Sequence, residues 1–299
     1  LDDSILNTFI DKRILVTGGA GFIGSHLIEK LMSVTDGIVC LDNYMSGMSK
    51  NHMQGAMYVD GDVSNINEVF TDQKFDFIFH FGEYSRVELS LEEPDLALLN
   101  TYQSFAPVLR FWRSSGAKLI YSGSSTKFSD AGEGKRLSPY TSAKSANTEL
   151  LVDYAKWYDL PFSIVYFYNV YGGRELTEGK YATVVGKFKK LVSAGATRLP
   201  TTRPGTQRRN FTHVNDITDG ILLAGAIGAG DGYGIGADEA FSVLDLCRMF
   251  ECEPLLQPSS PANRMTGELL TQKIKTLGWQ QKVSLPDHIK SFLEGVRPR

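Results

Sequence analysis

The segment TGGAGFIGSHL, Thr17 to Leu27, follows a short apolar run and opens a helix-length stretch. It contains the pattern G-x-G-x-x-G, in which backbone amides at a helix N-terminus can approach a pyrophosphate. The three glycines of the pattern are Gly19, Gly21 and Gly24. About twenty residues later, Asp42 ends the next apolar run, where a carboxylate can accept hydrogen bonds from the hydroxyls of an adenosine ribose.

The carboxylate of Asp42 would repel a 2′-phosphate, and no arginine follows it directly, so the sequence favours NAD over NADP. A second carboxylate, Asp62, follows the third apolar run and has two interpretations. It can accept a hydrogen bond from the adenine amino group, or it can cap the helix that begins near Ser64. The alternative for the glycine segment is a loop whose glycines serve only to pack the following helix closely, with Asp42 as a capping residue and no bound dinucleotide.

Short runs rich in Val, Ile, Phe and Tyr alternate with helix-length segments through the first 170 residues. The runs are Arg13–Gly18, Gly37–Asp42, Ala56–Asp62, Phe75–Phe81, Ala117–Gly123 and Phe162–Val170, and the helical segments lie near residues 22–33, 64–72, 95–115 and 139–159. This alternation predicts an α/β fold, a doubly wound parallel sheet with helices on both faces. We therefore expect residues 1–170 to form a dinucleotide-binding Rossmann domain.

After Tyr171 the alternation stops, and the remainder contains more Gly and Pro. We expect residues 171–299 to form mainly a smaller substrate-binding lobe, with a segment near 211–230 returning to the first domain. Substrates often bind between two such lobes.

The composition narrows the classes of function. A formal charge of −3 and a pI near 6.0 give no electrostatic case for nucleic acid. The three cysteines lack the spacing of a metal site, and their odd number fits a reducing compartment rather than a disulfide framework. No apolar run reaches the length of a membrane span, and the first residues lack the order of a signal peptide. We expect a cytoplasmic protein that binds no metal and no membrane.

His80, His213 and Asp216 could suggest a triad or a metal site, and we expect neither. His80 ends a buried strand without a second ligand nearby in the sequence. The segment FTHVND is interpreted as a short strand that leads into a helix capped by Asn215 or Asp216.

Tyr140 and Lys144 lie one helical turn apart in the segment YTSAK. Side chains at positions i and i+4 share a helix face, so the ammonium can lie near the phenol. A nearby cation favours the charged form of a phenol and so can make a tyrosine into a base. Such pairs also occur by chance on surface helices, so the pair alone does not establish catalysis.

Together these motifs resemble the extended short-chain dehydrogenase/reductase family, in its nucleotide-sugar epimerase and dehydratase branch. The resemblance spans nearly the whole chain and rests on TGGAGFIGSHL, LDNYMSG, GDV, HFGEYSRVELSLEEP, YSGSSTKF, YTSAK, YNVYGGR, QRRNFTHVND and LGW. It implies NAD as the cofactor. The cofactor-binding residues implied are Gly18, Gly19, Gly21, Phe22, Ile23, Gly24, Asp42, Asn43, Asp62, Val63, Phe81, Tyr140 and Lys144.

The resemblance also implies three catalytic residues, with Tyr140 and Lys144 as the family's Tyr-x-x-x-Lys pair and Ser124 as their hydroxyl partner. Ser122 or Ser125 could take the place of Ser124, which is selected by aligning SSTKFS with the family's serine loop. A turn serine with no catalytic role is the alternative.

For the substrate, the resemblance implies Arg86, Ser124, Asn169, Arg209 and Arg264. The last two match diphosphate-binding arginines, whose planar guanidinium meets phosphate oxygens in pairs. Arg208 is adjacent to Arg209 and could be mistaken for it, and either arginine could be an ordinary surface charge. Glu83 and Tyr84 stand where small or amide residues are more usual, and the sequence assigns Glu83 no role.

The resulting hypothesis is an NAD-dependent nucleotide-sugar epimerase, a UDP-hexose 4-epimerase, that works by transient oxidation to a keto-sugar and return of the hydride. The first alternative is a 4,6-dehydratase or reductase of the same family. The family's dehydratases carry an Asp-Glu pair directly after the Ser/Thr position, where this chain has Ser125 and Thr126, and Glu83 is the candidate to replace that pair. The second alternative is a non-catalytic NAD-binding sensor.

The family often dimerises through two helices that correspond to the segments near 95–115 and 139–159. Both segments carry aromatic residues that look exposed, namely Phe111, Trp112, Tyr154 and Trp157. We therefore expect a homodimer, and the alternative is that these side chains pack on the sheet.

Overall fold

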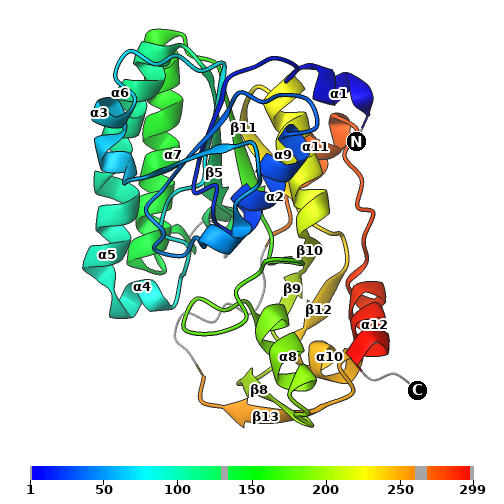
Figure 1. The fold of residues 1–299 in the computed structure, drawn as a ribbon. Coiled ribbons are helices and arrows are strands. Elements are labelled where there is room, and N and C mark those ends of the chain that lie inside the picture. The colour runs from blue at the N-terminus through cyan, green and yellow to red at the C-terminus, as the bar shows by residue number, and fades with distance from the viewer. Residues whose placement is uncertain (1, 129–133, 260–267, 297–299) are drawn as a thin grey trace.

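The computed structural model describes residues 2–128, 134–259 and 268–296. The described chain centres on a parallel sheet of seven strands (Figure 1). In spatial order they are β11 (Gly230–Ile235), β6 (Phe162–Phe167), β5 (Lys118–Ser124), β4 (Phe77–His80), β1 (Ile14–Thr17), β2 (Ile38–Asp42) and β3 (Met57–Asp60). The strand order reverses between β1 and β4, and a doubly wound sheet leaves a crevice at the carboxyl ends of such strands.

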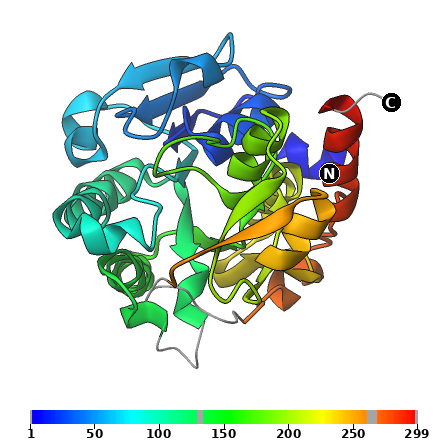
Figure 2. The ribbon, with the colours of Figure 1, turned by 90° about the horizontal axis from the view of Figure 1, so that it is seen from below.

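Helices cover both faces of the sheet, because its central strands are apolar on both sides. One layer contains α1 (Asp3–Asn7), α2 (Phe22–Leu31), α9 (Val214–Ile227) and α11 (Gln272–Thr276). The other contains α3 (Ile66–Val69), α4 (Leu89–Glu92), α5 (Pro94–Leu98), α6 (Phe105–Ser115) and α7 (Pro139–Tyr158), and Figure 2 shows α5 to α7 gathered on one side of the molecule. The predicted fold class, a doubly wound parallel sheet, is therefore confirmed.

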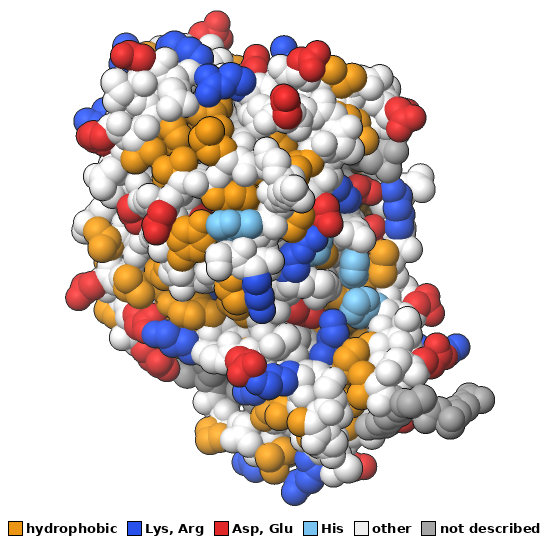
Figure 3. Space-filling model, in the orientation of Figure 1, with side chains coloured by type: hydrophobic (Ala, Val, Ile, Leu, Met, Phe, Trp, Pro, Cys, Tyr) orange, Lys and Arg blue, Asp and Glu red, His pale blue; other side chains and the backbone are white. Residues whose placement is uncertain are grey.

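A smaller lobe lies below the sheet in Figure 1. It contains α8 (Val184–Ser193), β8 (Arg198–Thr202) paired with β13 (Glu253–Gln257), β9 (Arg208–Asn210) paired with β12 (Ala240–Ser242), α10 (Val243–Met249) and α12 (Leu285–Val296). Phe188, Phe250 and Leu285 are part of its separate apolar core. A short pair, β7 (Val170–Tyr171) and β10 (Thr212–His213), lies where the chain passes between the lobe and the sheet. Acidic and basic side chains are interspersed over the face in Figure 3.

Three features differ from the sequence prediction. The strand β11 was not among the predicted runs, because three of its six residues are glycine. The segment near 95–115 is divided by a π-helical turn, Leu99–Gln103, between α5 and α6. The segment near 64–72 holds only a short 3₁₀ turn, Val63–Asn65, followed by α3.

The cap of α9 was also predicted wrongly. His213 caps this helix, and its Nδ1 accepts a hydrogen bond of 3.2 Å from the amide of Asn215. Asn215 and Asp216 lie inside the first turn. The carboxylate of Asp216 instead accepts hydrogen bonds from the amides of Lys282 and Val283.

Two of the four aromatic residues expected on the surface are buried. Phe111 and Trp112 pack between α6 and the sheet, and the indole of Trp112 donates to the carbonyl of Ala117. Both belong to the sheet-facing side of an amphipathic helix, which the sequence prediction did not resolve. Tyr154 is partly buried, and Trp157 is 62% exposed.

Candidate active site

A cavity of about 370 Å³ opens at the carboxyl ends of the central strands. Its wall combines the glycine segment, the ends of β2, β4, β5 and β6, and the start of α7. Leu176 and Thr183, from the segment that leads into α8, close it on the side of the smaller lobe. The cavity thus lies at the crevice expected of this sheet.

The glycine segment folds tightly over the end of β1. Gly18 has φ of +72°, and a Cβ there would lie 2.8 Å from the amide nitrogen of Gly82. A Cβ on Gly24 would lie 2.3 Å from the carbonyl oxygen of Gly18. Gly19 packs against Cys40 and Ile28 and does not line the cavity. Glycine is therefore required here for close backbone approach.

The N-terminus of α2 is open to this cavity. Gly21 is its N-cap residue, and no side chain in the described part of the protein caps the helix. Gly18, Gly21, Phe22, Ile23 and Gly24 all line the cavity. An uncapped helix N-terminus suits a phosphate group, so this wall fits the pyrophosphate of a dinucleotide.

Asp42 is held at the end of β2 by two backbone amides. Its Oδ2 accepts from Ala20 and its Oδ1 from Tyr44, both at 2.9 Å. Burial raises the pKa of this carboxyl, while the two amide hydrogen bonds oppose the shift. Asp42 lines the cavity, where a ribose hydroxyl can donate to it.

The neighbouring carboxylate, Asp62, serves as a cap. Its Oδ1 accepts from the amide of Ser64 at 2.9 Å, and its Oδ2 accepts from Nδ2 of Asn43 at 2.8 Å. Asn43 and Phe81 line the cavity, whereas Asp62 and Val63 do not. Of the two interpretations of Asp62, the structure shows the capping one.

The three residues expected to be catalytic meet at the cavity wall. Ser138 caps α7 in a capping box with Thr141, which places Tyr140 in the first turn and Lys144 one turn later. Tyr140, Lys144 and Ser124 all line the cavity, as do Ser122 and Ser125. Oγ of Ser124 lies 2.7 Å from Oγ1 of Thr126, and Nζ of Lys144 donates to the carbonyl of Ser122 at 2.6 Å.

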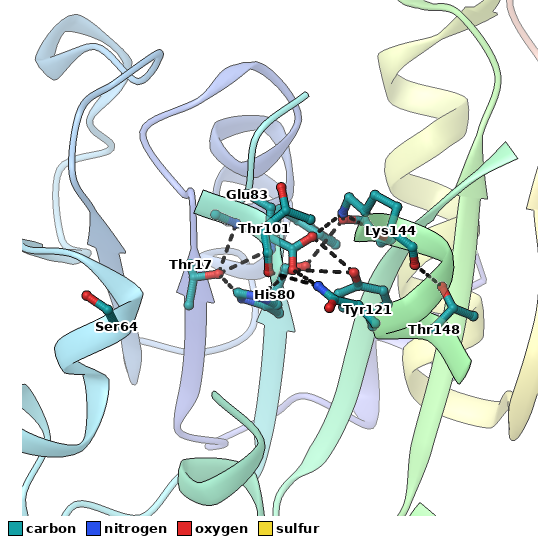
Figure 4. A network of polar contacts seen from close by, with 12 residues as sticks. Thr17, Ser64, His80, Glu83, Thr101, Tyr121, Lys144 and Thr148 are labelled. Atoms are coloured by element: carbon teal, nitrogen blue, oxygen red, sulfur yellow. Dashed lines mark hydrogen bonds and ion pairs between the residues drawn. The ribbon is translucent and has the colours of Figure 1, made fainter. Parts of the chain in front are cut away.

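Lys144 also has a partner that the sequence did not predict. Its ammonium forms an ion pair with the carboxylate of Glu83, whose side chain is 1% exposed (Figure 4). Burial alone would raise the pKa of Glu83, but Lys144 and the neighbouring His80 outweigh it and hold the pKa below its usual range. Glu83 is therefore ionised beneath the cavity wall.

The residues expected at the substrate are only partly brought together. Arg86 and Asn169 line the cavity. Arg86 donates from Nε to the carbonyl of Tyr181 at 3.1 Å, and Asn169 has φ of +38°. Arg209 lies in β9 and does not line the cavity. Arg264 lies outside the described residues.

Other residues at the cavity went unpredicted. Asn100 reaches it from the π-helical turn, and Thr126 reaches it beside Ser124. A hydroxyl two residues after Ser124 was the available signal for Thr126. Glu93 joins the strand-end segment to the smaller lobe, because it accepts hydrogen bonds from the hydroxyls of Tyr84 and Tyr181, at 3.2 and 3.3 Å.

Residues 14–236 match the model of the NAD dependent epimerase/dehydratase family. The chain belongs to this family. NAD is the family's cofactor, and the glycine segment, the open N-terminus of α2 and Asp42 fit it.

Curated relatives include both branches of the family. The chain is 28% identical to dTDP-D-glucose 4,6-dehydratase of Bos taurus, with 96% of this chain and 89% of the relative covered. It is also 28% identical to UDP-glucose 4-epimerase of Mycolicibacterium smegmatis, with 95% and 98% covered. Among solved structures, UDP-glucose 4-epimerase of Thermotoga maritima with UDP-glucose matches with a TM-score of 0.86 and 27% identity, covering 95% of this chain and 98% of that one.

Within the described residues, no cluster of three or more His, Cys, Asp or Glu side chains could hold a metal ion. The same residues contain no helix long and apolar enough to cross a bilayer.

Proposed function

We propose that this protein is an NAD-dependent epimerase of nucleotide sugars that acts on a UDP-hexose at C4. The family and the relatives named UDP-glucose 4-epimerase support the reaction class and the nucleotide. The relative from Bos taurus is named a dehydratase, so the choice between the two reactions depends on the site itself.

The observation that carries this choice is the position of the carboxylates. Among the described residues that line the cavity, the acidic ones are Asp42 and Glu83. Asp42 is held by backbone amides at the end of β2, and Glu83 is buried against Lys144. The two residues after Ser124 carry only hydroxyls. Elimination of water needs an acid and a base at two carbons, whereas reversible oxidation of one alcohol needs a single proton acceptor.

In this proposal Tyr140 takes the proton of the substrate hydroxyl and later returns it. Ser124 holds the same oxygen by a hydrogen bond, and Lys144 lines the cavity from the face of α7 that it shares with Tyr140. Bound NAD supplies the hydride acceptor and donor. The oxidised sugar must turn within the cavity between the two transfers, so that an epimer forms.

The test is incubation of the purified protein with NAD and UDP-glucose or UDP-galactose, followed by NMR of the anomeric protons. We expect interconversion of sugars of equal mass. Tyr140→Phe should lower turnover by about 10²–10⁴-fold, because general acid–base catalysis typically accelerates a reaction by that factor. It should leave the circular dichroism spectrum and the NAD affinity unchanged. Tyr58→Phe, at a tyrosine of β3 away from the cavity, is the matched control and should keep wild-type turnover.

Near-wild-type turnover of Tyr140→Phe would contradict the proposed mechanism. A product lighter by one water would assign the dehydratase reaction instead. A protein that binds NAD, interconverts no nucleotide sugar in a panel of UDP, GDP, CDP and dTDP hexoses, and binds a protein partner only with NAD would be a sensor.

We also propose a cytoplasmic homodimer. Leu99, Tyr102 and Trp157 are between 52% and 62% exposed on the helices that cover one face of the sheet, and a dimer through α6 and α7 would cover such side chains. The described cysteines are free thiols, which fits a reducing compartment. Light scattering at micromolar concentration should give twice the chain mass, and a monomeric mass would refute the dimer. Cell fractionation tests the location.

A further inference from the structure

The buried carboxylate of Glu83 accepts from side chains of β5 and α7 (Figure 4). Its Oε2 pairs with Lys144 and accepts from the hydroxyl of Tyr121 at 3.0 Å. Its Oε1 accepts from Nδ2 of Asn147 at 3.2 Å, and Asn147 is in turn held by the carbonyl of Thr101 at 2.9 Å. A buried charge with this many partners is fixed in position as well as in protonation.

His80 lies beside this carboxylate. The hydroxyl of Thr17 accepts from the amides of Phe81 and Gly82, at 3.2 and 3.0 Å, so its one proton points to Nδ1 of His80 at 2.7 Å. Nε2 of His80 lies 3.3 Å from Oε1 of Glu83.

Beneath the reacting phenol, the positive charge of Lys144 and the negative charge of Glu83 cancel. Tyr121 and Asn147, which also donate to Glu83, are neutral side chains. The ammonium of Lys144 is directed to Glu83, to the carbonyl of Ser122 at 2.6 Å and to the hydroxyl of Ser122 at 3.4 Å.

A further charged group near Tyr140 is Arg86. Its side chain is partly buried, donates to the carbonyls of Ser85 and Tyr181, and interacts electrostatically with Tyr140. Burial lowers the pKa of Arg86, and the nearby phenols oppose that shift. Tyr84, whose ring centroid is 6.4 Å from that of Tyr140, and Tyr181 lie on the same side, and both hydroxyls donate to Glu93, which pairs with Lys180.

We propose that Glu83 is a positioning residue that fixes the amine of Lys144 and cancels its charge. The positive charge of Lys144 near Tyr140 is then offset by the negative charge of Glu83. The effect of Glu83 on catalysis rests on the proposed epimerase reaction, whereas its effect on the ionisation of Tyr140 does not.

The electrostatic test is the ultraviolet titration of tyrosinate in the protein without substrate. The absorbance of each protein minus that of its Tyr140→Phe counterpart isolates the titration of Tyr140. Glu83→Gln removes one buried negative charge near the phenol, so the midpoint should move to lower pH by about one unit. Asp219→Asn is the matched control, because it removes a buried carboxylate that pairs with Lys30 and Lys282 away from the cavity, and it should leave the midpoint unchanged.

A double variant keeps the test valid if Glu83→Gln does not fold. Glu83→Gln with Lys144→Met removes both charges, which buried pairs often tolerate, and the midpoint should stay within about 0.3 pH unit of the wild type. A midpoint that rises by a unit or more would show that the charge of Lys144 controls Tyr140 and would overturn the proposal. An unchanged midpoint in a folded Glu83→Gln variant would overturn it as well.

The activity readout then separates positioning from folding. In Glu83→Gln the acidic limb of the pH profile of kcat/KM should move to lower pH by the same amount as the titration. Glu83→Asp keeps the negative charge on a shorter side chain. The titration midpoint of Tyr140 should therefore return to the wild-type value, while kcat stays reduced and KM changes little. If no sugar is turned over, the proposed function fails and the tyrosinate titration still decides the role of Glu83. A pH profile of Glu83→Gln that matches the wild type would contradict that role.

Discussion

Gly24→Ala tests the close contact that shapes the dinucleotide loop. A Cβ at this position would lie 2.3 Å from the carbonyl oxygen of Gly18 and 2.8 Å from Cα of Gly19. Comfortable non-bonded contacts begin at about 3.5 Å, so the loop and α2 must separate by roughly 1 Å. The neighbours are backbone atoms, so rotation of a side chain cannot relieve the overlap.

The cost follows from two opposing effects. Overpacking costs about 1–3 kcal/mol, and the better helix propensity of alanine returns about 1 kcal/mol. We expect a net loss of up to about 2 kcal/mol in the free energy of unfolding, which lowers Tm by up to about 8 °C. The affinity for NAD should fall by about 10- to 100-fold, because a displacement of roughly 1 Å misaligns the amides that meet the pyrophosphate.

The assay combines thermal unfolding without ligand and calorimetric titration with NAD well below Tm. Gly295→Ala in α12 is the control, because a Cβ there meets nothing within 4 Å. It should leave NAD affinity unchanged and keep or raise Tm. A Gly24→Ala protein with wild-type affinity and Tm would refute the described packing of the loop.

Two further substitutions probe the charges around the cavity. Asp42→Ala removes the proposed ribose acceptor together with the hydrogen bonds from the amides of Ala20 and Tyr44. NAD affinity should fall by at least about tenfold, because a charge-assisted hydrogen bond contributes about that much. The preference for NAD over NADP should also shrink. Calorimetry with both dinucleotides measures this, and an unchanged ratio of the two dissociation constants would contradict the assignment. Arg86→Gln removes a cation near Tyr140, so the tyrosinate midpoint should rise by about one pH unit, opposite in sign to Glu83→Gln. A fall of the midpoint would contradict this effect of Arg86 on Tyr140.

Local patterns predicted the parts of the fold that depend on neighbouring residues. The glycine segment specifies its own turn, since the backbone contacts of Gly18 and Gly24 lie mostly within a few residues or at the adjoining strand end. The alternation of apolar runs and helical segments predicted six strands of the central sheet, because buried parallel strands are apolar on both faces. The helical spacing likewise placed Tyr140 and Lys144 at the same cavity wall.

The prediction failed where the partner of a residue comes from elsewhere in the chain. Nothing in the sequence around Trp112 shows that Phe162, about fifty residues later, packs against its indole. His213 replaces the expected caps of α9, because Asp216 is taken by two amides more than sixty residues away. The strand β11 depends on pairing with β6 rather than on its glycine-rich sequence.

The role of Glu83 shows why a helical Tyr-Lys spacing does not by itself determine the acidity of the tyrosine. The spacing brings an ammonium near a phenol, but the field at the phenol is the sum of every buried charge within reach. Here the second charge comes from the end of β4, and its partners come from β5 and α7. Those residues meet only after the parallel strands have paired. The sign of the net charge beneath Tyr140 is therefore a property of the folded sheet, and a motif search that ends at Tyr140 and Lys144 would assign to Lys144 an electrostatic effect that Glu83 cancels.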